Sequence, residues 1–229
     1  MTSVSASASD EAWALLRLMQ LFDSQFPIGA FAHSSGLETY AQYALSPDAL
    51  YALQLHNLQQ GWGKLELAAC ALAWQQHQDP QALQQLCWEV DAWKSIPGLH
   101  KTSLSLGKRW ARLVTRLFPD YDTETINALQ PKHAAVVIGV LAAQLHIPQK
   151  NLLLAYAQST LSASLAAATR CMPLSPEQSQ EILLRLQASI IEAVQSVLAD
   201  PAAALFSATP TLDIRAHQQA LLHTRLFQS

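Results

Sequence analysis

Histidine and cysteine are the residues of this sequence best suited to bind a metal ion. The 229 residues include eight histidines and three cysteines. None of these residues has the spacing His-x-x-x-His, Cys-x-x-Cys or His-Glu-x-x-His, which would place several ligands on one local face. We therefore predict no tight, stoichiometric metal site in the isolated chain, and we expect His77, His146 and His223 at the surface or at helix ends. Ligands far apart in sequence can still converge in the fold, which equilibrium dialysis would reveal.

The sequence also carries no recognisable catalytic centre. Cys70 and Cys87 lie among apolar residues, which favours inert core thiols over activated nucleophiles. There is no Gly-x-Ser-x-Gly motif, and no glycine cluster precedes a helix in the manner of a nucleotide-binding loop. We predict a chain that is not an enzyme, holds no cofactor and binds no GTP itself.

Two groups of acidic residues lie close together in the sequence. Glu89 and Asp91 are two residues apart, on different faces of a helix, and are interpreted as solvated charges. Asp120, Asp122 and Glu124 follow a proline and are typical of a loop and a helix N-cap. Neither group predicts a shared substrate or metal.

The segment from Phe26 to Tyr40 is less ordinary. It combines a Pro-Ile-Gly turn with small residues and a helix start, and it is too apolar for a common loop. Its large apolar residues predict a turn pinned into the core: Phe26, Ile28 and Phe31. Ser34 or Ser35 is expected to cap the helix that follows. The residues alone leave two interpretations open, a buried turn with a helix start or a functional surface.

Helices must position these residues, because the composition and the helix-start signals both favour them. Alanine, leucine and glutamine are abundant and there are only seven glycines. Ser46-Pro47, Asp79-Pro80 and Ser175-Pro176 each pair a good N-cap with a proline at the first helical position. Gln178 completes a capping box with Ser175. The apolar stripe that follows predicts one helix of about 24 residues: Ile182, Leu186, Ile190, Val194 and Val197.

The same reasoning predicts an all-α chain without strands. The other expected helices cover residues 11–22, 34–44, 47–61, 64–78, 80–94, 99–117, 131–145 and 148–168, with a last short helix that follows Pro210 and ends near Leu226. We expect residues 1–10 to form a flexible tail and residues 11–229 to form a single-domain helical bundle of about eight to ten helices.

Charge, cysteine spacing and hydropathy narrow the classes of function. The net charge is -3 and 14% of residues are charged, so nucleic acid is not an expected partner. Three widely spaced cysteines favour a reducing compartment, and we expect a cytoplasmic protein. The first residues do not resemble a signal peptide. The longest apolar run, Ala134 to Ala143, is far shorter than the roughly 20 residues that span a bilayer, so we expect no membrane helix.

Five stretches, taken in order, resemble the UreF family of urease accessory proteins. Pro27 to Glu38 is similar to the family signature Pro-Ile-Gly-x-(aromatic)-x-x-Ser-x-Gly-Leu-Glu. The other stretches are Ser103-Leu104-x-Leu106-Gly107, His133 with Gly139, Arg170 to Leu183, and the terminus with Leu212-Asp213-Ile214 and Arg225 to Ser229. The resemblance covers nearly all of residues 11–229. Each motif is short, and the specificity comes from their order in a helical chain of this length.

Three positions depart from the family pattern. His100 stands where the family often has arginine, Ser175 replaces a usual glycine, and Gln219-Ala220 replaces a common His-Glu pair. Family roles are not transferred to these positions, which indicate a divergent member with a partner surface changed in detail.

The resemblance implies a UreF-like all-α homodimer that assists the insertion of nickel into apo-urease. It implies a scaffold that binds the accessory protein UreD, also called UreH, and then recruits the GTPase UreG. It places the partner-binding residues in the signature, at the end of a long helix and in the tail: Pro27, Gly29, Phe31, His33, Ser34, Gly36, Glu38, Tyr40, Arg170 and Arg225. In the family, the aromatic residue of the signature and the tail are associated with recruitment of the GTPase, which points here to Phe31 and Arg225.

The C-terminal segment is rich in apolar residues. Residues 212–229 are too apolar for a free tail, and we predict that they dock near Phe31 and recruit a partner. The alternative is a small helical enzyme or ligand-binding bundle with a polar pocket around His33, Ser34 and Glu38. A deep pocket with these side chains converging would favour the enzyme.

Overall fold

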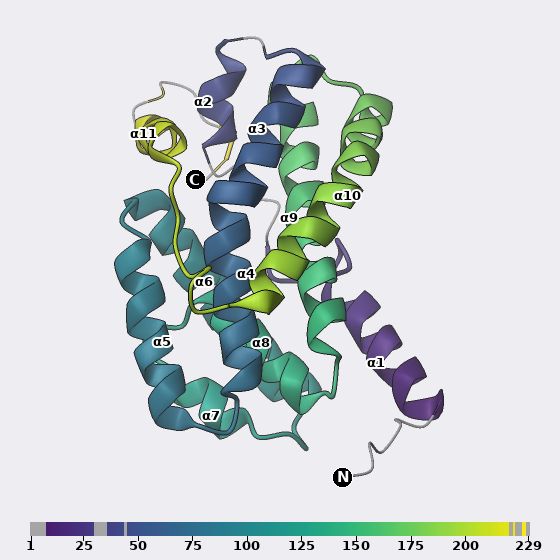
Figure 1. Cartoon of the computed structure of the whole chain (residues 1–229), viewed down its shortest axis with the longest axis vertical. Helices are drawn as coiled ribbons and strands as arrows, with labels where there is room; N and C mark the ends of the chain where they lie inside the picture. The colour runs from purple at the N-terminus through teal and green to yellow at the C-terminus, as the bar shows by residue number, and fades with distance from the viewer. Residues whose placement is uncertain (1–7, 30–35, 44, 220–221, 223–225, 228–229) are drawn as a thin grey trace.

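The predicted all-α class is confirmed by the computed structural model, which describes residues 8–29, 36–43, 45–219, 222 and 226–227. Across these residues the chain forms helices and no strand (Figure 1). The helices are α1 (Ala8–Leu21), α2 (Leu37–Ala41), α3 (Pro47–Gln60), α4 (Trp62–Gln75), α5 (Pro80–Trp93), α6 (Pro97–Leu117), α7 (Thr123–Ala128), α8 (Ala134–Gln144), α9 (Gln149–Cys171), α10 (Pro176–Ala199) and α11 (Pro210–Gln218).

Three helices begin where the cap-plus-proline pattern predicts. The side chain of Ser46 accepts a hydrogen bond from Ala49 N, and that of Asp79 accepts from the amides of Gln81 and Ala82. Ser175 and Gln178 form the predicted reciprocal capping box at the start of α10. These bonds satisfy backbone donors that have no partner within the helix.

Other boundaries differ from the predictions. α1 begins at Ala8, three residues before the expected start, and α11 ends at Gln218 rather than near Leu226. α7 was expected to be loop, although Asp122 caps it as proposed. α2 covers only five residues of the predicted 34–44 helix, and its N-cap is Gly36 rather than a serine.

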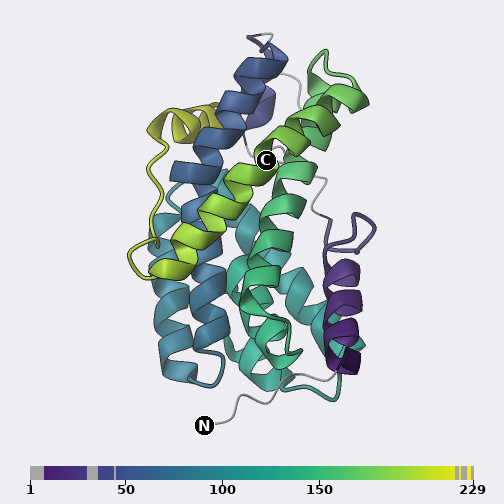
Figure 2. The ribbon, with the colours of Figure 1, turned by 45° about the vertical axis from the view of Figure 1, so that its right-hand side comes forward.

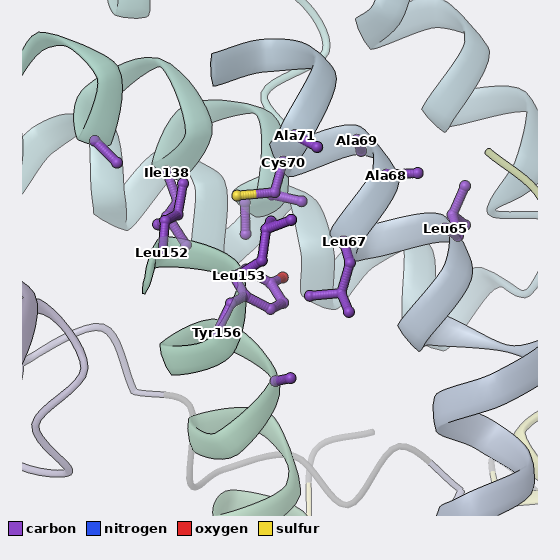
Figure 3. Packing of buried hydrophobic residues seen from close by; sticks show 14 of the residues in the cluster. Leu65, Leu67, Ala68, Ala69, Cys70, Ala71, Ile138, Leu152, Leu153 and Tyr156 are labelled. Atoms are coloured by element: carbon purple, nitrogen blue, oxygen red, sulfur yellow. The ribbon is translucent and has the colours of Figure 1, made fainter. Parts of the chain in front are cut away.

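The core forms where α4 packs against α8 and α9. Leu67 and Cys70 of α4 lie beside Ile138 of α8 and Leu153 of α9 (Figure 3). Every residue of α8 from Ala134 to Ala143 is buried, which explains its continuous apolar run. Cys70 and Cys87 are buried as predicted, and burial raises the pKa of the Cys87 thiol to about 11, so that both remain protonated at neutral pH.

α10 crosses the face of the bundle obliquely over α9 and α3 (Figure 2). α10 is long and apolar enough to cross a membrane, but the core helices of soluble proteins can have the same length and composition. Its predicted stripe, from Ile182 to Val197, is buried against these neighbouring helices. α1 lies at the side of the bundle and turns Trp13, Leu16 and Met19 outward.

Candidate functional site

The structure describes six of the ten predicted partner-binding residues: Pro27, Gly29, Gly36, Glu38, Tyr40 and Arg170. Phe31, His33, Ser34 and Arg225 lie outside the described residues, as do Ser35 and His223. The first part of the signature is held by α6. Phe26 is buried and stacks on Trp110 with ring centroids 4.8 Å apart, and Arg109 donates to the Ile28 carbonyl at 2.8 Å. The predicted apolar turn is thus pinned at Phe26 and Ile28.

The second part of the signature is joined to the C-terminal segment. Gly36 has φ 88°, a left-handed conformation that favours glycine, and a Cβ there would lie 3.0 Å from the Ala216 Cα of α11. Its amide donates to Gln219 Oε1 at 2.9 Å, and the Thr39 hydroxyl donates to the Arg215 carbonyl at 2.9 Å. Glycine is therefore required for conformation and for close packing against α11.

Glu38 is the centre of this junction. Its side chain is buried, with 7% of the residue exposed. One carboxylate oxygen accepts from Gln219 Nε2 at 3.1 Å, and the other accepts from the backbone amide of Leu226 at 2.5 Å. A single carboxylate thus holds two points of the C-terminal segment, and Gln219 bridges Gly36 and Glu38.

Two arginines form the rim of the junction. Arg215 of α11 donates to the Tyr43 hydroxyl at 2.8 Å and lies over the Tyr43 ring, 4.4 Å from its centroid, and 5.9 Å from that of Tyr40. Arg170, at the end of α9, lies over the Phe227 ring at 5.0 Å and is exposed. α11, Leu226 and Phe227 thus contact α2 and the end of α9. The predicted docking near Phe31 stays a prediction, because Phe31 lies outside the described residues.

The polar pocket of the enzyme alternative is not supported at Glu38. Its carboxylate faces the C-terminal segment, where both oxygens are bonded. The neighbouring groove has a volume of about 550 Å³ and is open to solvent. It is lined by other, largely apolar residues of α2, α3, α11 and the connections that precede α3 and α11: Tyr40, Leu45, Ala49, Leu53, His56, Ala208, Pro210, Thr211 and Leu212. The positions of His33 and Ser34 lie outside the described residues.

A second polar cluster lies between α5, α6 and the N-cap of α8. His100 Nε2 and His133 Nε2 lie 2.6 and 3.1 Å from the same oxygen of Asp91. Although desolvation acts to raise it, hydrogen bonds from both histidines lower the pKa of Asp91. Burial, together with the charge of Lys94, lowers the pKa of His133. Asp91 is part-exposed, as expected of a solvated charge, but the fold also brings both histidine rings to it, which the sequence interpretation did not include.

Sequence reasoning also missed the part that Gln219 and Arg215 play. Gln219 was identified only as a departure from a family pattern, and its contacts, with Gly36 and Glu38, are more than 180 residues distant in sequence. His100 was likewise a departure. For Gln219 in the junction and His100 in the second cluster, the departure from the family pattern was thus the only signal in the sequence.

Comparison with known proteins gives a consistent result. The family model described as UreF matches residues 45–187. The chain is 30% identical over 225 residues to urease accessory protein UreF of Bacillus sp. (strain TB-90), covering 94% of this chain and 99% of that protein. It is 29% identical to the protein of the same name from Haemophilus influenzae (strain PittEE), with 93% and 94% covered. The corresponding protein of Nostoc sp. is 28% identical, with 93% and 95% covered.

Proposed function

This chain belongs to the UreF family of urease accessory proteins, and from that premise we propose that it is a non-catalytic scaffold for the insertion of nickel into apo-urease. In this proposal the protein works in the cytoplasm as a homodimer, binds UreD (UreH) and recruits the GTPase UreG. Its contact surface is the junction between α2, the end of α9 and the C-terminal segment.

One observation supports this surface above the others. Glu38 and Gln219 tie the signature to the C-terminal segment, so two stretches with family resemblance form one end of the molecule. Arg170 and Tyr40 belong to that same end. A binding partner that contacts either stretch would meet both.

The mechanism that we propose is positional. A scaffold that binds one nucleotide state of the GTPase more tightly than another shifts the population toward that state, and nucleotide state is then coupled to metal release. Arg225 is suited to such a contact because its planar guanidinium offers a fork of donors to carbonyls or a carboxylate, which lysine cannot copy.

The test is a pull-down of UreG on the complex of this protein with UreD. We expect Arg225→Ala, and deletion of residues 212–229, to lose UreG while UreD is retained. Arg116→Ala is the matched control, because Arg116 is an exposed arginine on α6, outside the junction. Melting temperatures are measured in parallel.

Two outcomes would count against the proposal. Retention of UreG by the truncated protein, with a melting temperature lowered by several degrees, would show that the C-terminal segment only covers the core. Equal loss of UreG in Arg116→Ala would show a general charge effect rather than a contact of the tail.

A further inference from the structure

We propose that Asp91, His100 and His133 form a binding site for a divalent first-row transition metal ion of the nickel or zinc type. Across the part of the chain that the structure describes, this is the one cluster in which three such side chains bring ligand atoms within 4.8 Å of one another. The ligands come from the C-terminal turn of α5, the first turn of α6 and the residue before α8. Local sequence spacing could not reveal such a set, so this proposal replaces the prediction, made from spacing alone, that the isolated chain has no stoichiometric metal site.

The chemistry of the ligand set selects the metal class. Two imidazoles and one carboxylate suit borderline ions such as Ni²⁺, Zn²⁺ and Co²⁺, whereas Mg²⁺ and Ca²⁺ prefer oxygen ligands. Such ions bind their ligands at about 2.0–2.2 Å, which keeps neighbouring ligand atoms about 3 Å apart. The 3.1 Å separation of His133 Nε2 and Asp91 Oδ1 already fits, and the 2.6 Å contact of His100 needs only a small opening.

His133 is held in the orientation that a ligand requires. It is fully buried, and its Nδ1 lies 3.0 Å from the Ser103 hydroxyl, so its Nε2 points at Asp91. A metal on Nε2 would leave the proton on Nδ1 for donation to Ser103, the usual arrangement behind a metal-bound histidine. Gly107 permits the approach of α6, because a Cβ there would lie 2.0 Å from the Lys132 carbonyl oxygen. Because its hydroxyl orients the His133 ring, Ser103 is a positioning residue.

Exposure makes the site open rather than closed. The side chains of Asp91 and His100 are 40% and 33% exposed, whereas that of His133 is 0% exposed and forms the floor. Three protein ligands leave at least one coordination position for water or for another molecule, unlike a structural site with four protein ligands. Lys94, whose charge lowers the pKa of His133, is paired with Glu66. The geometry therefore suits an ion that enters and leaves.

A simpler account is that Asp91 only accepts hydrogen bonds from the two rings. The His100→Arg substitution separates the accounts, because arginine can still pair with Asp91 but cannot bind a metal. The site is also independent of the partner-binding proposal, since none of its ligands belongs to α2, the end of α9 or the C-terminal segment. A negative result in the metal experiment leaves the pull-down result intact, and the reverse also holds.

The experiment is equilibrium dialysis of tag-free, metal-stripped protein against Ni²⁺ alone and Zn²⁺ alone, with Mg²⁺ as the negative probe. We expect one Ni²⁺ or Zn²⁺ per chain in the micromolar range and no Mg²⁺. His100→Arg and Asp91→Asn should each weaken binding at least about tenfold, and Ser103→Ala should weaken it less. The matched control is His56→Gln, an exposed histidine on α3, which should bind as the unsubstituted protein does.

The far-ultraviolet circular dichroism of each variant shows that it is folded, and the metal-induced rise in melting temperature gives a second readout. This rise should be present in the unsubstituted protein and in His56→Gln and absent in His100→Arg. Absence of binding by the unsubstituted protein would overturn the proposal. Unchanged affinity in both His100→Arg and Asp91→Asn would also overturn it, because the bound ion would then lie elsewhere.

Discussion

Glu38 shows how one side chain can join two ends of a sequence. A buried carboxylate is tolerated when several donors satisfy it, and here Gln219 and the Leu226 amide supply them. The signature motif identified Glu38 as a site residue. It did not show that the glutamate faces the protein's own C-terminal segment, because the partner residues are 181 and 188 positions away.

We predict that Glu38→Gln lowers the free energy of unfolding by about 1–3 kcal/mol, because an amide in place of the carboxylate turns one acceptor into a donor that faces other donors. Urea denaturation measures the loss, and limited proteolysis should cleave the C-terminal segment faster. The exposed Glu181→Gln should change neither measurement. Equal stability of Glu38→Gln would mean that the junction contributes little to folding.

At the scale of helices, the sequence predicted most where the signals are local. Capping residues with proline fixed the starts of α3, α5 and α10, because these hydrogen bonds lie within a few residues. α2 was predicted too long, and the residues that contact its start, Arg215 and Gln219, are 176 and 183 positions away from their partners, where local signals do not reach. The cluster of Asp91, His100 and His133 depends on how α5, α6 and α8 pack, which periodicity does not encode.

Three helices also meet at a buried charge cluster. Lys94, at the C-cap of α5, pairs with Glu66 of α4, and Tyr156 of α9 donates to that same carboxylate at 2.8 Å. The side chains of Lys94 and Glu66 are only 9% and 14% exposed. Although burial acts to raise it, the charge of Lys94 and the hydrogen bonds lower the pKa of Glu66. The ionised form is therefore the stabilising one.

We predict that Lys94→Met destabilises the protein by about 3–5 kcal/mol at neutral pH, because it leaves a buried carboxylate without its cation. The folded-state pKa of Glu66 is below its unfolded value, so the unsubstituted protein loses this stability as the pH falls through the folded pKa. In Lys94→Met the carboxyl can protonate instead, so the two proteins should differ less at low pH.

Urea denaturation from about pH 7 to about pH 3.5 tests this prediction. The control is Arg185→Met, which breaks the exposed pair with Asp48 and should have little effect at any pH. A constant difference between Lys94→Met and the unsubstituted protein across this range would show that lost packing, rather than the unpaired charge, causes the destabilisation.

At the scale of the whole molecule, α4, α8 and α9 form the core, and α2 and α11 lie at one end of the bundle, away from the centre of that core. α2 has five residues, too few to be a stable helix alone, and depends on its neighbours. We predict that truncation after Gln218 raises amide hydrogen exchange in α2 by about tenfold or more, because the Gln219 and Leu226 contacts are lost.

Hydrogen exchange followed by mass spectrometry gives the readout, and peptides from α4 and α8 serve as the internal control. Their exchange should be unchanged by the truncation, since both helices are buried in the core. Equal exchange in α2 with and without the last residues would show that α9 and α11 hold it without the Gln219 and Leu226 contacts.

The tie between residues 36–39 and 215–226 also has a consequence for biosynthesis. A ribosome releases the segments of a chain in order, and here the helices of the core emerge long before the residues that complete α2. Closing so long a loop adds only a modest entropic cost once the core has formed. The loop cannot close, however, before the C-terminal residues have left the ribosome. The end that we propose for partner binding thus becomes complete only after residues 215–227 have emerged, so a nascent chain that lacks them would carry a folded core without a competent docking surface.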